Sequence, residues 1–155
     1  MNKDFVYKRR LLALADLLQK LPPKRFDYSH WVGDNWKGSA DLSCGTTACA
    51  FGWATTMPSL RRLGLMLKPD HRNELGGEVK LKRKSGKFLS TERAALEVFG
   101  LSYGEFEYLF VPYSGRELTA YKLPESYLGD LASAKQVAAH IRKFVNAKYN
   151  RAVAR

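Results

Sequence analysis

Two cysteines, Cys44 and Cys49, are the residues of this chain best suited to covalent chemistry. The sequence around them predicts a helix from near Gly45 to about Thr56, which would put Cys44 at the helix start. Free backbone N–H groups and the helix dipole stabilise a thiolate at such a position and lower its pKa. A cysteine-dependent enzyme would also need a base, and the histidines available are His30, His71 and His140. Cys44 is therefore the candidate nucleophile.

The same cysteines also have a purely structural interpretation, which we favour. Cys49 shares a helical stripe with Trp53 and is expected to be a small buried hydrophobic residue. Cys44 would then only shape the entry to the helix. A structural zinc ion needs four ligands, and the sequence offers no second pair of Cys or His. It also lacks a phosphate-binding loop and a dinucleotide fingerprint. We therefore expect no metal and no cofactor, and a binding protein rather than an enzyme.

Basic residues form the second group with a functional interpretation. The net charge is +11, and residues 61–93 hold ten Lys or Arg against four Asp or Glu. A strand over Glu78–Lys84 would place its alternating lysines on one face, where they can follow a phosphate backbone. The predicted anion-binding surface consists of Lys80, Lys82, Arg83, Lys84 and Lys87, and the fold decides whether Arg61, Arg62, Arg142 and Lys143 extend it.

The lysines of this strand have an alternative interpretation. Lysines on an edge strand prevent edge-to-edge pairing and aggregation. An excess of lysine also keeps a protein in solution without any specific partner. Both alternatives predict the same residues, so the pattern alone leaves them open.

Aromatic residues are dense between residues 26 and 36, where Trp31 and Trp36 stand among glycines and aspartates. Such a loop usually packs onto the core. It would otherwise form a stacking platform for nucleic-acid bases or a contact surface for a protein partner. The slightly acidic charge of residues 31–60 argues against the stacking platform. Trp31 and Trp36 are therefore candidate contact residues.

Local patterns predict the elements that position these groups. Leucines at helical spacing predict a helix over residues 4–21, which Pro22-Pro23 ends. The turn signal Ser85-Gly86 predicts an antiparallel hairpin within residues 65–89. Residues typical of helix starts precede three more helices: Ser90 or Thr91, Ser102 with Glu105, and Ser133 with Gln136. In the last helix Lys148 falls on the apolar side, so the helix is expected to leave the core by that residue.

The whole chain, residues 1–155, is predicted to form one domain of the α+β class that is mainly helical. About five helices would surround one core, with a small antiparallel β-hairpin as a basic insert at about 65–89 and a frayed tail at about 150–155. No apolar run approaches the roughly 20 residues of a membrane span, so we expect no membrane partner. Two cysteines form no disulfide framework, and the start lacks the apolar stretch of a signal peptide. We therefore expect a cytoplasmic protein.

The segment Ser43–Ala54 contains the pattern C-G-T-x-x-C-x-x-G-W. This pattern resembles that of a family of small uncharacterised bacteriophage and bacterial proteins. Similar features are Leu21-Pro22, Phe26-Asp27, the turn Phe99-Gly100-Leu101-Ser102, Leu109-Phe110 near a proline, and the final helix around Val137-Ala138, so the resemblance covers most of the chain. It implies a phage or prophage source, with the host cytoplasm as the location, and it implies no activity.

The function expected from these observations is binding through a basic surface. The partner would be nucleic acid or a nucleoprotein complex, and a host protein is a further candidate partner. With the resemblance, the expected role is that of a phage-type accessory, host-takeover or anti-defence factor that acts as an inhibitor. The alternatives are a cysteine-dependent enzyme that uses Cys44 and a protein-binding module that uses the aromatic loop 26–36.

Overall fold

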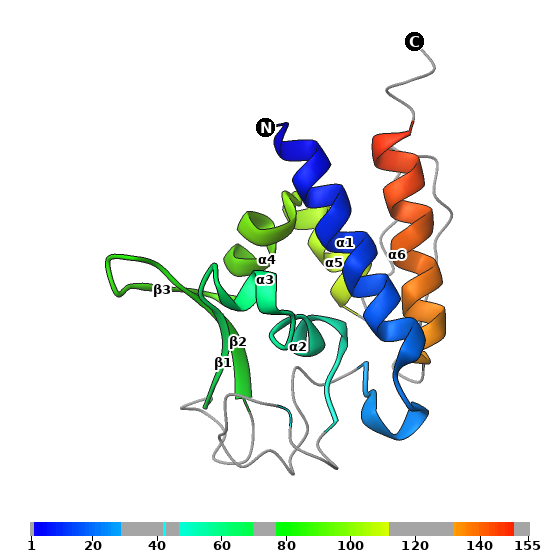
Figure 1. The fold of residues 1–155 in the computed structure, drawn as a ribbon, viewed down its shortest axis with the longest axis horizontal. Coiled ribbons are helices and arrows are strands. Elements are labelled where there is room, and N and C mark those ends of the chain that lie inside the picture. Colours follow the sequence, from blue (N-terminus) through cyan, green and yellow to red (C-terminus); the bar gives the residue numbers. More distant parts are fainter. Residues whose placement is uncertain (1, 29–41, 43–46, 70–76, 112–131, 151–155) are drawn as a thin grey trace.

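Two long antiparallel helices, α1 (Lys3–Lys20) and α6 (Ala134–Tyr149), pack against each other along one side of the protein (Figure 1). The computed structural model describes residues 2–28, 42, 47–69, 77–111 and 132–150. Leu11, Leu14 and Leu18 of α1 are fully buried, as their helical spacing predicts. The α1–α6 pair is therefore the scaffold against which the shorter elements are arranged.

Shorter helices fill the space beside this pair. They are α2 (Ala50–Ala54), α3 (Pro58–Arg61), α4 (Thr91–Phe99) and α5 (Tyr103–Phe110), with one 3-10 turn, η1 (Pro23–Arg25). The predicted starts of α4, α5 and α6 are confirmed, because the hydroxyls of Ser90, Ser102 and Ser133 accept hydrogen bonds from the backbone N–H groups three residues later. Within the described ranges, no helix is long and apolar enough to cross a membrane.

The core is aromatic where three helices meet. Phe51 of α2, Phe99 of α4 and Phe110 of α5 form a triangle with ring centroids 5.5 to 6.1 Å apart. All three rings are buried, with exposed fractions of 1% or less. Offset and tilted aromatic pairs of this kind stabilise a core beyond the area that they bury. The mainly helical α+β class predicted from the sequence is confirmed.

A three-stranded antiparallel sheet projects from the helices and confirms the predicted hairpin (Figure 1). Its strands are β1 (Leu65–Pro69), β2 (Gly77–Lys82) and β3 (Phe88–Leu89), in that spatial order. Leu65 lies opposite Leu81 and Leu67 opposite Val79, so one face is apolar and buried. This inner face packs against α2 and α4, whereas the outer face carries the lysines.

The helix expected from near Gly45 begins later than predicted. α2 starts at Ala50, and Cys49 is its N-cap residue. The backbone of Ala48 bonds to a distant segment: its N–H donates to the carbonyl of Arg25, and its carbonyl accepts from the backbone N–H of Asp27. A residue in such a bridge between distant segments has an extended backbone, which a helix cannot include. Cys49, and not Cys44, therefore stands at the helix entry.

The expectation that α6 leaves the core before Lys148 is wrong. The Lys148 ammonium donates to the Glu105 carboxylate at 2.8 Å and to the Gly100 carbonyl at 3.0 Å. The exposed fractions of the two side chains are only 17% and 7%, respectively. Glu105 also accepts from the backbone N–H of Ser102 in the capping box of α5. This largely buried ion pair ties α6 to the turn between α4 and α5.

Replacing Lys148 by Met should lower the free energy of unfolding by about 2 kcal/mol or more, because the buried Glu105 carboxylate loses its counter-ion. Urea denaturation measures this loss. The matched control is Arg142→Met, which removes a cation of the same helix from an ion pair with the exposed Asp16. That change should cost less than about 1 kcal/mol. Equal losses of unfolding free energy in the two variants would show that the Lys148–Glu105 pair stabilises the fold no more than an exposed ion pair.

Candidate nucleic-acid interface

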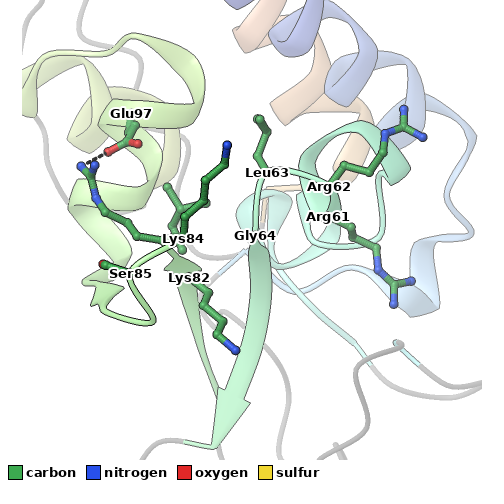
Figure 2. A pocket seen from close by; sticks show the side chains of 10 residues that line it. Arg61, Arg62, Leu63, Gly64, Lys82, Lys84, Ser85 and Glu97 are labelled. Atoms are coloured by element: carbon green, nitrogen blue, oxygen red, sulfur yellow. Dashed lines mark hydrogen bonds and ion pairs between the residues drawn. The ribbon is translucent and has the colours of Figure 1, made fainter.

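A basic groove lies between the end of α3 and the turn that joins β2 to β3 (Figure 2). Its volume is about 700 Å³. The lining residues come from two segments of the chain and from α4: Arg61, Arg62, Leu63 and Gly64; Leu81, Lys82, Arg83, Lys84 and Ser85; and Glu97. Five cations and one carboxylate therefore surround the groove.

Gly64 holds the two walls of the groove together. Its carbonyl accepts a hydrogen bond from the backbone N–H of Lys82 at 2.9 Å. Its φ angle is +101°, which only glycine adopts without strain. A Cβ atom on Gly64 would lie 2.2 Å from the carbonyl oxygen of Lys82, so no other residue fits here. The buried Leu60 anchors α3 on the other side and fixes the position of Arg61 and Arg62.

The cations that line the groove differ in their surroundings. Arg83 donates to the Glu97 carboxylate at 2.6 Å, so the one acidic lining residue is matched by one of the cations. Figure 2 shows Lys84 and Lys82 extending in opposite directions, with Lys84 on the side of Leu63. Lys82 and Arg61 also line a second, smaller hollow of about 210 Å³ that reaches Met66 of β1. The positive surface therefore continues from the groove onto the outer face of the sheet.

The structure brings together some of the predicted basic residues and separates others. Arg61 and Arg62 join Lys82, Arg83 and Lys84 in the groove. Lys87 is exposed just beyond the turn but does not line the groove. Lys80 forms an ion pair with Glu78 at 2.9 Å on the outer face of β2.

The remaining pair of predicted cations does not extend this surface. Arg142 and Lys143 lie on α6, which stands away from the sheet (Figure 1). The Arg142 guanidinium binds Asp16 of α1 at 2.8 Å. The edge-strand alternative is wrong for Lys82, which lies between Gly64 on one side and Phe88 of β3 on the other. Lys80 lies beyond the two residues of β3, so both interpretations stay open for it.

Phe88 is an exposed aromatic residue that the sequence reasoning missed. It lies opposite Lys82 in the β2–β3 register, and 39% of its surface is exposed. The Lys68 ammonium lies 3.8 Å from the centroid of its ring. Neighbouring residues of a strand point to opposite faces, so Phe88 lies on the face opposite the half-buried Leu89.

The predicted aromatic contacts Trp31 and Trp36 lie outside the described residues, so their role stays a prediction. The beginning of that loop packs onto the core. Tyr28 is 3% exposed and donates its hydroxyl to the carbonyl of Leu109 at 3.1 Å. Phe26 stacks beside it and is half-buried. These two rings are therefore structural.

The thiol chemistry considered from the sequence finds no support at Cys49. The Cys49 sulfur is buried and accepts a hydrogen bond from the Gly52 N–H at 3.5 Å. Burial raises the pKa of the Cys49 thiol to about 12, so the nucleophilic thiolate is suppressed near neutral pH. This confirms Cys49 as a small buried residue, and Trp53 of the same short helix is buried with it.

The cysteine-dependent alternative also involves Cys44 and the three histidines. Cys44, His30 and His71 lie outside the described residues. His140 is buried between α5 and α6, where its Nε2–H donates to the Tyr108 carbonyl, and burial lowers its pKa. In the part of the chain that the structure describes, no group of three His, Cys, Asp or Glu residues is placed to hold a metal ion.

Cys49 should react with iodoacetamide at pH 8 roughly a hundredfold more slowly in the folded protein than in guanidinium chloride, because burial lowers its thiolate fraction. The experiment uses a Cys44→Ser variant, which leaves Cys49 as the only thiol, and mass spectrometry follows the labelling. The folded-state rate should rise with pH up to about 12. Equally fast labelling in both states would contradict a buried, protonated Cys49.

Comparison with known proteins shows a partial similarity to an enzyme. An alignment 111 residues long, which covers 68% of the chain, is 33% identical to a protein of Phocaeicola vulgatus described as glutamate–tRNA ligase. The chain spans only 18% of the length of that relative. No family model matches the chain. No solved structure matches it either. The similarity therefore concerns one segment of the ligase and does not transfer the activity of the whole enzyme.

Proposed function

We propose that this protein binds nucleic acid through the basic groove. The observation that carries the proposal is that Arg61 and Arg62 line the same groove as Lys82 and Lys84, although about twenty residues separate the two pairs in the sequence. Arginine and lysine side chains provide most of the contacts that proteins make with phosphate oxygens. The groove is therefore suited to the phosphate backbone of a polynucleotide.

The shape and exposure of the groove agree with a polymeric partner. All the cations that line it are exposed to solvent, and Arg83 is the one that pairs with Glu97 of the same groove. The groove offers one exposed apolar side chain, Leu63, and lacks the apolar enclosure typical of a site for a small molecule. A net charge of +11 adds a long-range attraction that accelerates encounter with any polyanion.

The partial similarity favours RNA as the nucleic acid, because the relative is named for a reaction on tRNA. The sequence-based expectation of a phage accessory, host-takeover or anti-defence role is narrower than this proposal and stays a prediction. The protein-binding alternative depends on Trp31 and Trp36 and likewise stays a prediction.

Reversing two groove charges with Lys82→Glu and Lys84→Glu should weaken binding of a labelled RNA by about 10- to 100-fold, because each lysine that contacts a phosphate contributes on the order of 1 kcal/mol. Fluorescence anisotropy measures the affinity at 50 to 200 mM salt. The slope of log affinity against log salt should become shallower in the variant, since fewer counterions are released.

The matched control carries the same change in net charge at a distant site, with Lys135→Glu and Lys143→Glu on the exposed side of α6. It should retain most of the affinity. If both double variants lose affinity equally, binding follows net charge alone and the groove has no special role. If the wild-type protein shows no affinity for RNA or DNA at 50 mM salt, the proposed function is wrong.

A further inference from the structure

We propose that the nucleic acid held by the groove is single-stranded and that one of its bases stacks on Phe88. This inference rests on the proposed function and specifies the class of its ligand. The observation behind it is an exposed aromatic ring placed directly beside a groove cation: Phe88 is the cross-strand partner of Lys82, whose side chain lines the groove.

The position of Phe88 on the sheet makes its ring accessible. Inner-face residues such as Leu81 and Val79 are buried against the helices, so the apolar core is complete without Phe88. Phe88 instead shares the outer face with Lys82 and Lys68, and Figure 1 shows this end of the sheet projecting away from the helices. The Lys68 ammonium lies over one face of the ring, so a ligand would contact the 39% of the side chain that is exposed.

The cations around Phe88 select a ligand that combines an aromatic face with negative charge. Lys68 lies 3.8 Å from the ring centroid, and Lys82 is directly opposite. A nucleotide has both features: its base stacks on an aromatic side chain while its phosphates contact the neighbouring lysines. Lys80 on the same outer face is paired with Glu78, the cross-strand partner of Lys68, so Lys68 and Lys82 are the cations next to Phe88 that this ion pair does not include.

Stacking on a side chain distinguishes single strands from duplexes. The bases of a duplex are already stacked on one another and present only their edges in the grooves, whereas an unpaired base can turn its face to an aromatic ring. A duplex would therefore use the groove cations alone. A single strand would use the groove cations and Phe88 together, and should bind more tightly.

The test compares four ligands of equal length by fluorescence anisotropy: a 12-nucleotide oligouridylate, the corresponding oligothymidylate, a fully abasic 12-mer and a 12-base-pair RNA duplex. The wild-type protein should bind the oligouridylate or the oligothymidylate about tenfold more tightly than the abasic strand and the duplex. The two single strands with bases separate an RNA ligand from a DNA ligand.

Phe88→Leu should lose roughly tenfold in affinity for the strands with bases and show unchanged affinity for the abasic strand. Phe88→Tyr should retain the wild-type affinities, because its ring stacks equally well. The matched control is Tyr103→Leu, which removes another exposed aromatic ring, on α5. It should leave all four affinities unchanged.

The outcomes separate this inference from the proposed function. If groove variants lose affinity but Phe88→Leu binds every ligand like the wild type, the groove binds phosphates and the stacking inference is wrong. If Phe88→Leu lowers the affinity for the abasic strand as much as for the others, the ring stabilises the hairpin and does not stack on a base, which also overturns the inference. If no ligand binds, the proposed function itself fails.

Discussion

The contact between Gly64 and Lys82 is the constraint on which the groove depends. A backbone hydrogen bond joins the end of α3 to the end of β2, and the approach is so close that a Cβ atom on Gly64 would meet the Lys82 carbonyl. The positive φ of Gly64 turns the chain from α3 directly into β1. As a result, arginines at the end of a helix and lysines of a hairpin line a common groove, although neither segment forms a basic groove by itself.

A second constraint keeps the rest of the fold in place around this groove. Lys148 near the end of α6 reaches Glu105 and the carbonyl of Gly100, so the last helix is fixed to the turn between α4 and α5. Gly100 has a positive φ, and the Tyr7 ring of α1 occupies the space beside it. α5, α6 and the turn between α4 and α5 thus meet at this ion pair, and α1 packs beside the turn through Tyr7. α4 in turn packs on β2 and carries Glu97, so the orientation of the hairpin is linked to the helical scaffold.

The sequence predicted those elements whose signals are local. The starts of α4, α5 and α6 depend on serines that bond to their own first turns, and the hairpin follows from alternation and a Ser-Gly turn. The start of α2 was misplaced because Ala48 bonds to residues near Phe26, far away in the sequence. The partner of Lys148 is likewise distant. Within the candidate site, the sequence identified the lysines that line the groove. Only the fold shows that Arg61 and Arg62 line it with them, whereas Arg142 and Lys143 do not. Phe88 was missed because a two-residue strand has too few positions to establish a periodicity.

The separation between the aromatic core and the exposed groove has an evolutionary consequence. The side chains of Lys82, Lys84, Arg61 and Arg62 are exposed, so replacing them removes little buried surface and leaves the folding equilibrium nearly unchanged. Gly64, Gly100 and the aromatic triangle tolerate far less change. Substitutions at these exposed positions can therefore change the charge of the groove without disturbing the architecture, whereas substitutions in the glycines or the aromatic triangle change the fold itself.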